Sequence, residues 1–323
     1  MSAPRGWLRD VEGDKRRLLD ERSRVQLGLV TRAQVLEAGY SSSAIDRRLA
    51  SGEFEPVCHR VYRMRGGPAE SAPQSLLAAC LSLGSGTVAS HRSAAWLWGL
   101  DGFNAVPRLL EVTTLHGRRV VLPQFKIHQR REALTEGYTH RAGVPVTVLT
   151  RTLLDLAPVL SEAALEIALD SAARGRPEFF FELDEFLCGI SASGRKGINR
   201  LSEVLKLRIG GAATGSPFET ELFQVLRRAD IPLPILQLPV FKEPDRPFVH
   251  IDFAWPSRMI ALFPDGGSYH QARRRARLDA SQRLELIKLG WKPIVLMPGM
   301  LKDPGWIASF AELFWPADPT AEL

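Results

Sequence analysis

The chain of 323 residues is 45% apolar and 24% charged, which is typical of a globular protein and excludes a fibrous or largely disordered one. Its length predicts two or three domains. The net charge of +6 suits an anionic partner such as nucleic acid, although so mild an excess is also common without one.

Cysteine spacing and the apolar runs restrict the class of protein further. Cys58, Cys80 and Cys188 are widely spaced and form no CxxC pair, which argues against a zinc site or a disulfide framework and favours reduced thiols. The charged start of the chain lacks the apolar stretch of a signal peptide, and no apolar run approaches the length of a membrane span. We therefore expect a cytoplasmic protein.

Residues 14–65 have the pattern of a small helical domain followed by a hairpin. The first helix is expected over 14–28, with Leu18, Leu19 and Val25 facing inward. Thr31 and Gln34 have the spacing of a capping box, and Gly39 is placed to end the helix that they start.

A second short helix and a hairpin follow. Ser41 or Ser42 is expected to cap this helix, which carries Arg47 and Arg48 on its outer face. Residues 54–64 alternate as a two-stranded wing does. This order predicts a winged helix-turn-helix, with both arginines facing the DNA major groove. The alternative is two solvated arginines on an ordinary helix.

Residues 72–190 have the pattern of a second α/β unit. Helices are expected over 72–84 and 91–100, strands over 108–114 and 124–129, and a strand running into helices over 144–175. Thr150 or Thr152 is a candidate helix cap. The polar residues that stand out are His91, Arg92, Arg151 and Asp155, and we expect them to serve in caps and salt bridges rather than in a site.

The last third of the chain begins with linker-like sequence. Residues 191–199 and 208–217 are rich in Gly and Ser and flank a short basic helix, which favours a domain boundary there. The predicted domains are a winged helix-turn-helix over 1–70, a middle α/β domain over 71–207 and a nuclease-like domain over 208–323. The predicted fold class is therefore mixed α/β, with a restriction-endonuclease-like core at the C-terminus.

The elements of this last domain are expected in the order helix, strand, strand, strand, helix, strand. That is the order of the PD-(D/E)xK nuclease core, in which acids on neighbouring strands hold a Mg²⁺ or Mn²⁺ that polarises the scissile phosphate. Asp252, at the end of a strand, is the expected first ligand; the alternative is a structural Asp in a hairpin. His270 suits a general base or a phosphate contact. A basic cluster follows that suits a phosphate backbone, or else a solvated helix face: Arg273, Arg274, Arg275 and Arg277.

Several motifs, taken in order, resemble known families. SPFETEL, HIDFAWP, PDGGSYH, LDASQR and LGWKPIVL resemble the nuclease-like domain related to very-short-patch repair endonucleases, over about 214–298. LVTRAQVLEAGYSSSAIDRRLASGEF and HRVYRM resemble the winged-helix domain of type IV (abortive-infection) antitoxins. ASHRSAAWLWGLDG and GVPVTVLTRTLLDLA resemble the middle region that accompanies it in actinobacterial proteins.

The chain departs from the nuclease-like pattern at Phe263, where that family usually has a metal-binding Glu. The very-short-patch repair endonucleases also lack an acid there and use one Asp and a main-chain carbonyl. Their resemblance implies Asp252 and the Pro264 carbonyl as ligands, with Asp265 and His270 in the places of two catalytic histidines. Glu219 or Glu221, on the preceding helix, could supply a further carboxylate. In the wing, Arg60 stands where the antitoxins usually have Gly, which predicts an altered turn.

Two functions remain open from the sequence. The first is a DNA-binding, Mg²⁺-dependent endonuclease. The second is a non-catalytic, antitoxin-like transcriptional repressor, whose nuclease-like domain has become a binding or dimerisation module and whose protein partner is a cognate toxin. Binding to RNA, or to a partner without nucleic acid, is a weaker alternative.

Overall fold

A computed structural model describes residues 5–117, 121–130, 137–190, 197–208, 211–243, 246–265 and 272–315, with the backbone alone described for 5–12, 243 and 272–279. Contacts divide the chain into two compact units, Met1–Leu156 and Ala157–Leu323. Both mix helices with sheets, as predicted. The three-domain division is a finer one and stays a prediction. Every helix in the described parts of the chain is too short or too polar to pass through a bilayer.

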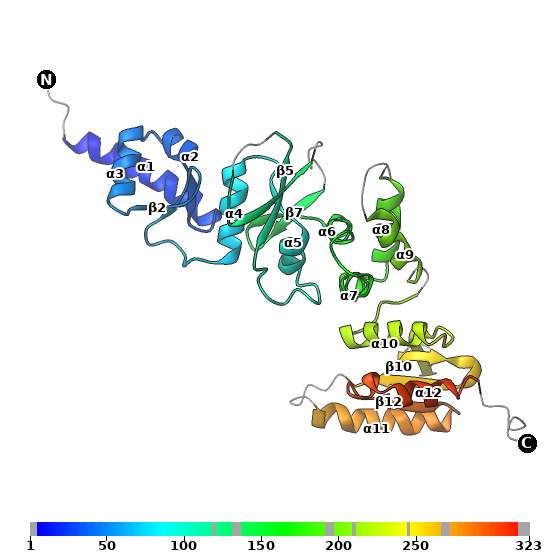
Figure 1. The fold of residues 1–323 in the computed structure, drawn as a ribbon. Coiled ribbons are helices and arrows are strands. Elements are labelled where there is room, and N and C mark those ends of the chain that lie inside the picture. Colours follow the sequence, from blue (N-terminus) through cyan, green and yellow to red (C-terminus); the bar gives the residue numbers. More distant parts are fainter. Residues whose placement is uncertain are drawn as a thin grey trace, which may run out of the picture. The chain divides into compact units, whose positions relative to one another are not determined.

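The first unit begins with a winged helix (Figure 1). Its elements are α1 (Arg5–Val25), β1 (Leu29–Thr31), α2 (Arg32–Glu37), α3 (Ser42–Ala50), β2 (Phe54–Cys58) and β3 (Val61–Met64). The strands form an antiparallel sheet in the order β1-β3-β2. Thr31 and Gln34 form the predicted capping box, and Ser41 caps α3 by accepting a hydrogen bond from the Ala44 N–H.

The core of the winged helix joins α1 to the sheet and to α3. Leu19, Val30, Ile45 and Phe54 are almost fully buried in it. The prediction that Leu18 and Val25 also face inward is wrong, since they are 47% and 77% exposed. The buried stripe of α1 runs instead through Leu19 and Ser23, one turn apart, because side chains four apart lie on one helix face.

A five-stranded sheet completes the first unit, in the order β6-β5-β4-β8-β7. Its elements are α4 (Ala72–Leu83), β4 (Val88–Ala89), α5 (His91–Trp98), β5 (Leu110–Leu115), β6 (Phe125–Arg130), β7 (Tyr138–Arg141), β8 (Val144–Thr147) and α6 (Leu149–Leu156). Val112, Phe125 and Ile127 pack in one apolar core with α4. Because side chains alternate along a strand, Glu111 and His128 point to the opposite face.

The predicted cap of α6 is wrong. The helix begins at Leu149, so Thr150 and Thr152 both lie inside it. Thr152 is buried, and its hydroxyl donates to the Val148 carbonyl four residues back at 2.9 Å, a common arrangement for a threonine within a helix. Arg151 and Asp155, both expected to serve in caps or salt bridges, form an ion pair, with Nε and Oδ1 2.8 Å apart.

The second unit opens with three packed helices, α7 (Glu162–Ala173), α8 (Phe179–Cys188) and α9 (Ile198–Lys206). Its remaining elements are α10 (Pro217–Arg228), β9 (Ile235–Glu243), β10 (Arg246–Trp255), the 3₁₀ helix η1 (Pro256–Arg258), β11 (Ile260–Pro264), α11 (Ala272–Lys288), β12 (Lys292–Leu296), η2 (Met300–Lys302) and α12 (Pro304–Ala311). From α10 to β12, helices and strands follow the order expected from the sequence.

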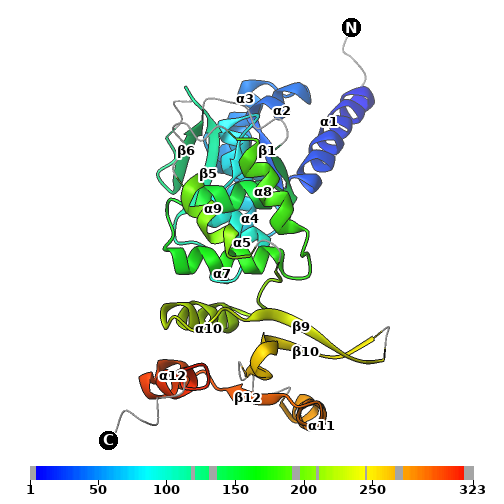
Figure 2. The ribbon, with the colours of Figure 1, turned by 90° about the vertical axis from the view of Figure 1, so that its right-hand side faces the viewer.

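The four strands form one sheet in the order β12-β11-β10-β9. β9, β10 and β11 are antiparallel, whereas β11 and β12 are parallel and are connected through α11. Leu222 and Leu226 of α10 share a core with Phe310 at the end of α12, and Leu286 of α11 packs against Ala254 and Ala261 on the other face. α10 and α11 therefore lie on opposite sides of the sheet (Figure 1), from which β9 and β10 extend as a long ribbon (Figure 2).

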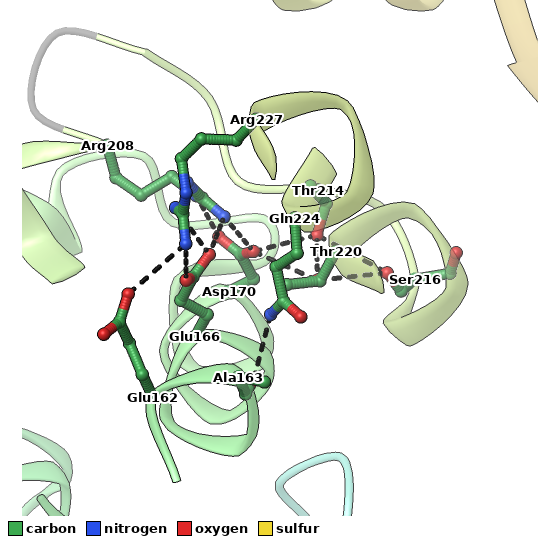
Figure 3. Close-up of polar contacts among 10 residues, drawn as sticks. All are labelled: Glu162, Ala163, Glu166, Asp170, Arg208, Thr214, Ser216, Thr220, Gln224 and Arg227. Carbon is green, nitrogen blue, oxygen red and sulfur yellow. Dashed lines mark hydrogen bonds and ion pairs between the residues drawn. The ribbon is translucent and has the colours of Figure 1, made fainter. Parts of the chain in front are cut away.

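A buried polar network attaches α10 to α7 (Figure 3). Arg208 is 1% exposed and forms ion pairs with Asp170 and Glu166 of α7. Thr214 and Thr220 donate hydroxyl hydrogen bonds to Asp170 at 3.1 and 3.0 Å. Arg208 and Thr214 lie in the Gly-rich stretch with linker-like composition, so this stretch carries buried anchoring contacts.

Candidate functional site

The two arginines of α3 have different surroundings. Arg47 is exposed. Arg48 is partly buried: its guanidinium carbon lies 4.3 Å from the centre of the Tyr40 ring, and its Nε lies 3.4 Å from Glu53 Oε2. These two contacts, a cation–π interaction and an ion pair, stabilise the position of Arg48 within the domain. Arg47 is therefore the one of the pair that the structure presents to a ligand.

The tip of the wing carries two further basic side chains, His59 and Arg60, both exposed. Arg60 has a φ of 59°, in the left-handed region that glycine enters without strain. Its carbonyl accepts a hydrogen bond from the Arg32 N–H at 2.8 Å. The departure from glycine at this position therefore leaves β2 and β3 paired and places backbone strain, together with a positive charge, at the tip.

Asp252 of β10 and Glu219 of α10 share one hydrogen-bond donor. The side-chain amide of Gln237 donates to Glu219 Oε2 and to Asp252 Oδ1, at 3.1 Å in each case. Gln237 has a φ of 53° within β9. A non-glycine residue held in the left-handed region costs on the order of 1 kcal/mol, and such residues often occur at functional sites.

A pocket between the sheet and α11 is lined by predicted site residues from β10 and from the end of β11. Asp252, Pro264 and Asp265 all line it, beside Gln282 and Arg283. Phe263, in the place of the usual acid, lines it as well. Glu221 is exposed on α10, so Glu219 is the acid that shares a hydrogen-bond donor with Asp252.

The remaining predicted residues of this site can be placed only in part. His270 lies outside the described residues. The backbone of α11 carries Arg273, Arg274, Arg275 and Arg277, whose side chains also lie outside the description. The basic cluster therefore belongs to the helix that covers the pocket, and its contact with a phosphate backbone stays a prediction.

The donor set around Asp252 can be tested for its fit to Mg²⁺. Two carboxylates converge on one amide nitrogen, the arrangement expected where a cation could replace a donor. Carboxylate oxygens are ligands that Mg²⁺ accepts. Glu219 is also engaged elsewhere, since it accepts from the Gly215 N–H at 2.6 Å and from Ser216 Oγ at 3.0 Å. Burial raises the pKa of its carboxyl, and the hydrogen bond from Gly215 only partly offsets this.

A different group of ionisable side chains meets in the first unit. Within the described residues, the one group of three His, Cys, Asp or Glu whose donor atoms lie within 4.8 Å of one another is His91, Glu111 and His128. His91 was expected to have a structural role, and the other two were not singled out. The available signal was the alternation of β5 and β6, which places Glu111 and His128 on the polar face.

Comparison with known proteins supports the antitoxin resemblance for part of the chain. Residues 16–65 match the family model described as "Transcriptional regulator, AbiEi antitoxin", a range that runs from α1 through β3. The crystal structure of the RV2827C protein from Mycobacterium tuberculosis is similar at 18% identity and a TM-score of 0.40, over 64% of this chain and 78% of that one. No curated protein matches the sequence. The nuclease-like resemblance of 214–298 stays a prediction.

Proposed function

We propose that this protein is a DNA-binding transcriptional regulator of the antitoxin type, which contacts DNA through its winged helix. The observation that carries the proposal is a capped α3 that exposes Arg47, beside a wing that exposes His59 and Arg60, all within the range that matches the antitoxin family. In winged helices the second helix of the motif enters the major groove, and basic side chains on a wing can reach the adjacent phosphates. A cytoplasmic location and a cognate toxin as partner belong to the same proposal.

Contacts of the residues next to Arg47 on α3 also support this proposal. Arg48 is fixed against Tyr40 and Glu53, so it holds α3 against the domain rather than reaching outward. Asp46, exposed beside Arg47, lies 3.7 Å from Arg32 in an ion pair. That pairing reduces the repulsion that an acidic side chain would otherwise exert on a phosphate backbone.

DNA binding by the full chain tests the proposal. Sequences would be selected from a random duplex library on the wild-type protein, and affinities measured over a series of salt concentrations. We expect Arg47→Ala and Arg60→Ala each to weaken binding and to lower the slope of log K against log salt by about one, since each lost phosphate contact releases about one counterion fewer. Arg228→Ala, which removes an exposed arginine at the end of α10, is the matched control. Equal affinities for all four proteins, or no binding at low salt, would overturn the assignment.

A second candidate, a Mg²⁺- or Mn²⁺-dependent DNA endonuclease, is favoured by the convergence of Glu219 and Asp252 on Gln237. Asp252, Glu219 and the Pro264 carbonyl would hold the ion, and Asp265 and His270 would act on the phosphate and the attacking water. A bound ion of this kind polarises the scissile phosphate and activates water.

Plasmid cleavage with each metal separates the two candidates. Wild type and Asp252→Asn are compared, because the amide keeps the size of the side chain and removes its charge. Cleavage by wild type alone would establish the endonuclease. Clean wild-type protein that binds DNA without cutting it would exclude the endonuclease and leave the regulator.

A further inference from the structure

The polar face of the five-stranded sheet brings together three side chains from separate elements. His91 is the first residue of α5, Glu111 lies on β5 and His128 on β6. We propose that His91, Glu111 and His128 form a binding site for a divalent transition metal of the zinc class. Two imidazoles and one carboxylate are a ligand set that zinc uses in catalytic sites, where a fourth position stays open to water or substrate.

The spacing of the three donors suits one ion. Nε2 of His128 lies 2.7 Å from Glu111 Oε2, and the rings of His91 and His128 stack with centroids 3.5 Å apart and planes 9° from parallel. Metal–ligand bonds of about 2.0–2.1 Å in a tetrahedral site place neighbouring ligand atoms about 3.3 Å apart. The donor atoms of all three side chains already lie within 4.8 Å of one another. The two stacked rings would have to rotate out of their parallel arrangement to direct both nitrogens at a shared ion.

A metal of this class binds neutral imidazole and ionised carboxylate, so binding would release any proton that the three donor atoms carry. Glu111 is only 3% exposed, so its charge requires a partner.

A second layer of contacts holds His91 in place. Its Nδ1 lies 3.0 Å from Ser90 Oγ, and the Thr113 hydroxyl donates to the same oxygen at 2.7 Å. With Nδ1 engaged, Nε2 is the nitrogen available to a metal, and such outer contacts commonly orient metal-binding histidines. His91 also has a φ of 51°, a backbone conformation that non-glycine residues adopt uncommonly.

Two cations compete for Glu111. Arg92 Nη1 lies 3.5 Å from Oε1, and Lys126 Nζ lies 3.6 Å from Oε2. Both side chains reach solvent, at 39% and 44% exposure, so either can swing away when an ion enters. This geometry predicts opposite effects on metal affinity: removing Lys126 should strengthen binding, whereas removing a ligand should weaken it.

Titration of the full chain with Zn²⁺ by calorimetry, and with Co²⁺ by visible absorption, tests the site. We expect one ion per chain and a Co²⁺ spectrum of low coordination number. His91→Ala and His128→Ala should weaken binding more than about 100-fold, beyond the 10–100-fold typical of outer-layer changes, and Ser90→Ala about tenfold. Lys126→Ala should tighten it, and His140→Ala, which removes an exposed histidine of β7, should leave it unchanged.

Circular dichroism of each variant establishes that it is folded. The Lys126 variant guards against a misfolding artefact, because a gain in affinity cannot come from damage to the fold. Absence of binding by wild type would overturn the proposal. So would retained binding in both histidine variants, or an equal loss in the His140 control, since either would place the ion elsewhere.

Discussion

Arg208 donates two hydrogen bonds to the carboxylate of Asp170, from Nε to Oδ1 at 2.8 Å and from Nη2 to Oδ2 at 2.9 Å, across a separation of 38 residues. Both side chains are 1% exposed or less. The remaining nitrogen, Nη1, has no hydrogen-bond partner among the described residues, and the guanidinium carbon lies 4.3 Å from the centre of the Phe223 ring. Arg208 thus links the segment before α10 to α7 (Figure 3). Its contact with Phe223 also joins it to the apolar side of α10.

Replacing Arg208 by methionine should destabilise the protein strongly. The substitution fills the space but removes the cationic partner of the buried Asp170, whereas Glu166 keeps its ion pair with Arg227. Breaking a buried pair from one side costs about 3–5 kcal/mol. Urea unfolding would measure the loss. Arg176→Met, which breaks an exposed pair with Glu182, is the control and should cost less than about 1 kcal/mol. Similar losses in the two variants would contradict a special role for the buried arginine.

The wing tip offers a substitution whose effects on stability and on binding differ in sign. Arg60→Gly removes the strain of a left-handed arginine, so it should be more stable than Arg60→Ala by about 1 kcal/mol. Both variants remove the same charge, and we expect both to bind DNA more weakly and to the same extent. Urea unfolding and DNA titration of the pair would separate the two effects. Equal stabilities would mean that the turn is not strained.

The hydrogen bonds of Gln237 to Glu219 and Asp252 support a prediction that does not depend on cleavage. In Gln237→Ala the amide that separates Glu219 from Asp252 is lost, and the two carboxylates should attract a cation more strongly. We expect Mg²⁺ to raise the melting temperature of this variant more than that of wild type, because an ion that binds the folded state stabilises it. Asp252→Asn combined with Gln237→Ala should abolish the shift. A shift that persists in the double variant would place the ion away from Glu219 and Asp252.

Local chemistry in the sequence was sufficient to predict the winged helix. The Thr31 capping box, the Ser41 cap and the glycine at position 39 act within a few residues of one another, so the pattern and the structure agree. The order of elements from α10 to β12 was predictable for the same reason. Strand β4 was missed because it has two residues, and β7 because the Tyr-Thr-His-Arg stretch is polar and mostly exposed.

Contacts between distant segments were not predictable. Arg208 lies in a Gly-rich stretch whose composition favours a linker. Its ion pair with Asp170 becomes apparent only in the folded chain. Gln237 carried no motif, and its bridging position depends on the pairing of β9 with β10 and on the placement of α10. His91, Glu111 and His128 come from three elements whose proximity is set by sheet order rather than by sequence spacing.

Alkaline pH should destabilise the protein through Cys80 of α4. Burial raises the pKa of this thiol to about 12, against an ordinary value of 9.0. Between the ordinary pKa and the raised pKa, the thiol ionises in the unfolded chain but stays protonated in the folded protein. Ionisation therefore favours the unfolded chain, so the contribution of this thiol to stability is complete below the ordinary pKa and is lost as pH rises toward the raised one. At a pH one unit above the ordinary pKa, the loss from this group is about 1.4 kcal/mol.

Comparing wild type with Cys80→Ala by urea unfolding, at neutral pH and at pH about 10, isolates this thiol from the lysines and tyrosines that both proteins share. The variant should be less stable at neutral pH, because the smaller side chain leaves a cavity in the core around α4, yet it should lose less stability on going to alkaline pH.

Alkylation gives an independent readout of thiol burial, since the thiolate is the reactive form of cysteine. Exposed Cys188 should react first, Cys58, whose pKa burial raises to about 11, more slowly, and buried Cys80 only as the chain unfolds. Rapid modification of Cys80 in the folded protein would show that α4 opens far more readily than its packing implies.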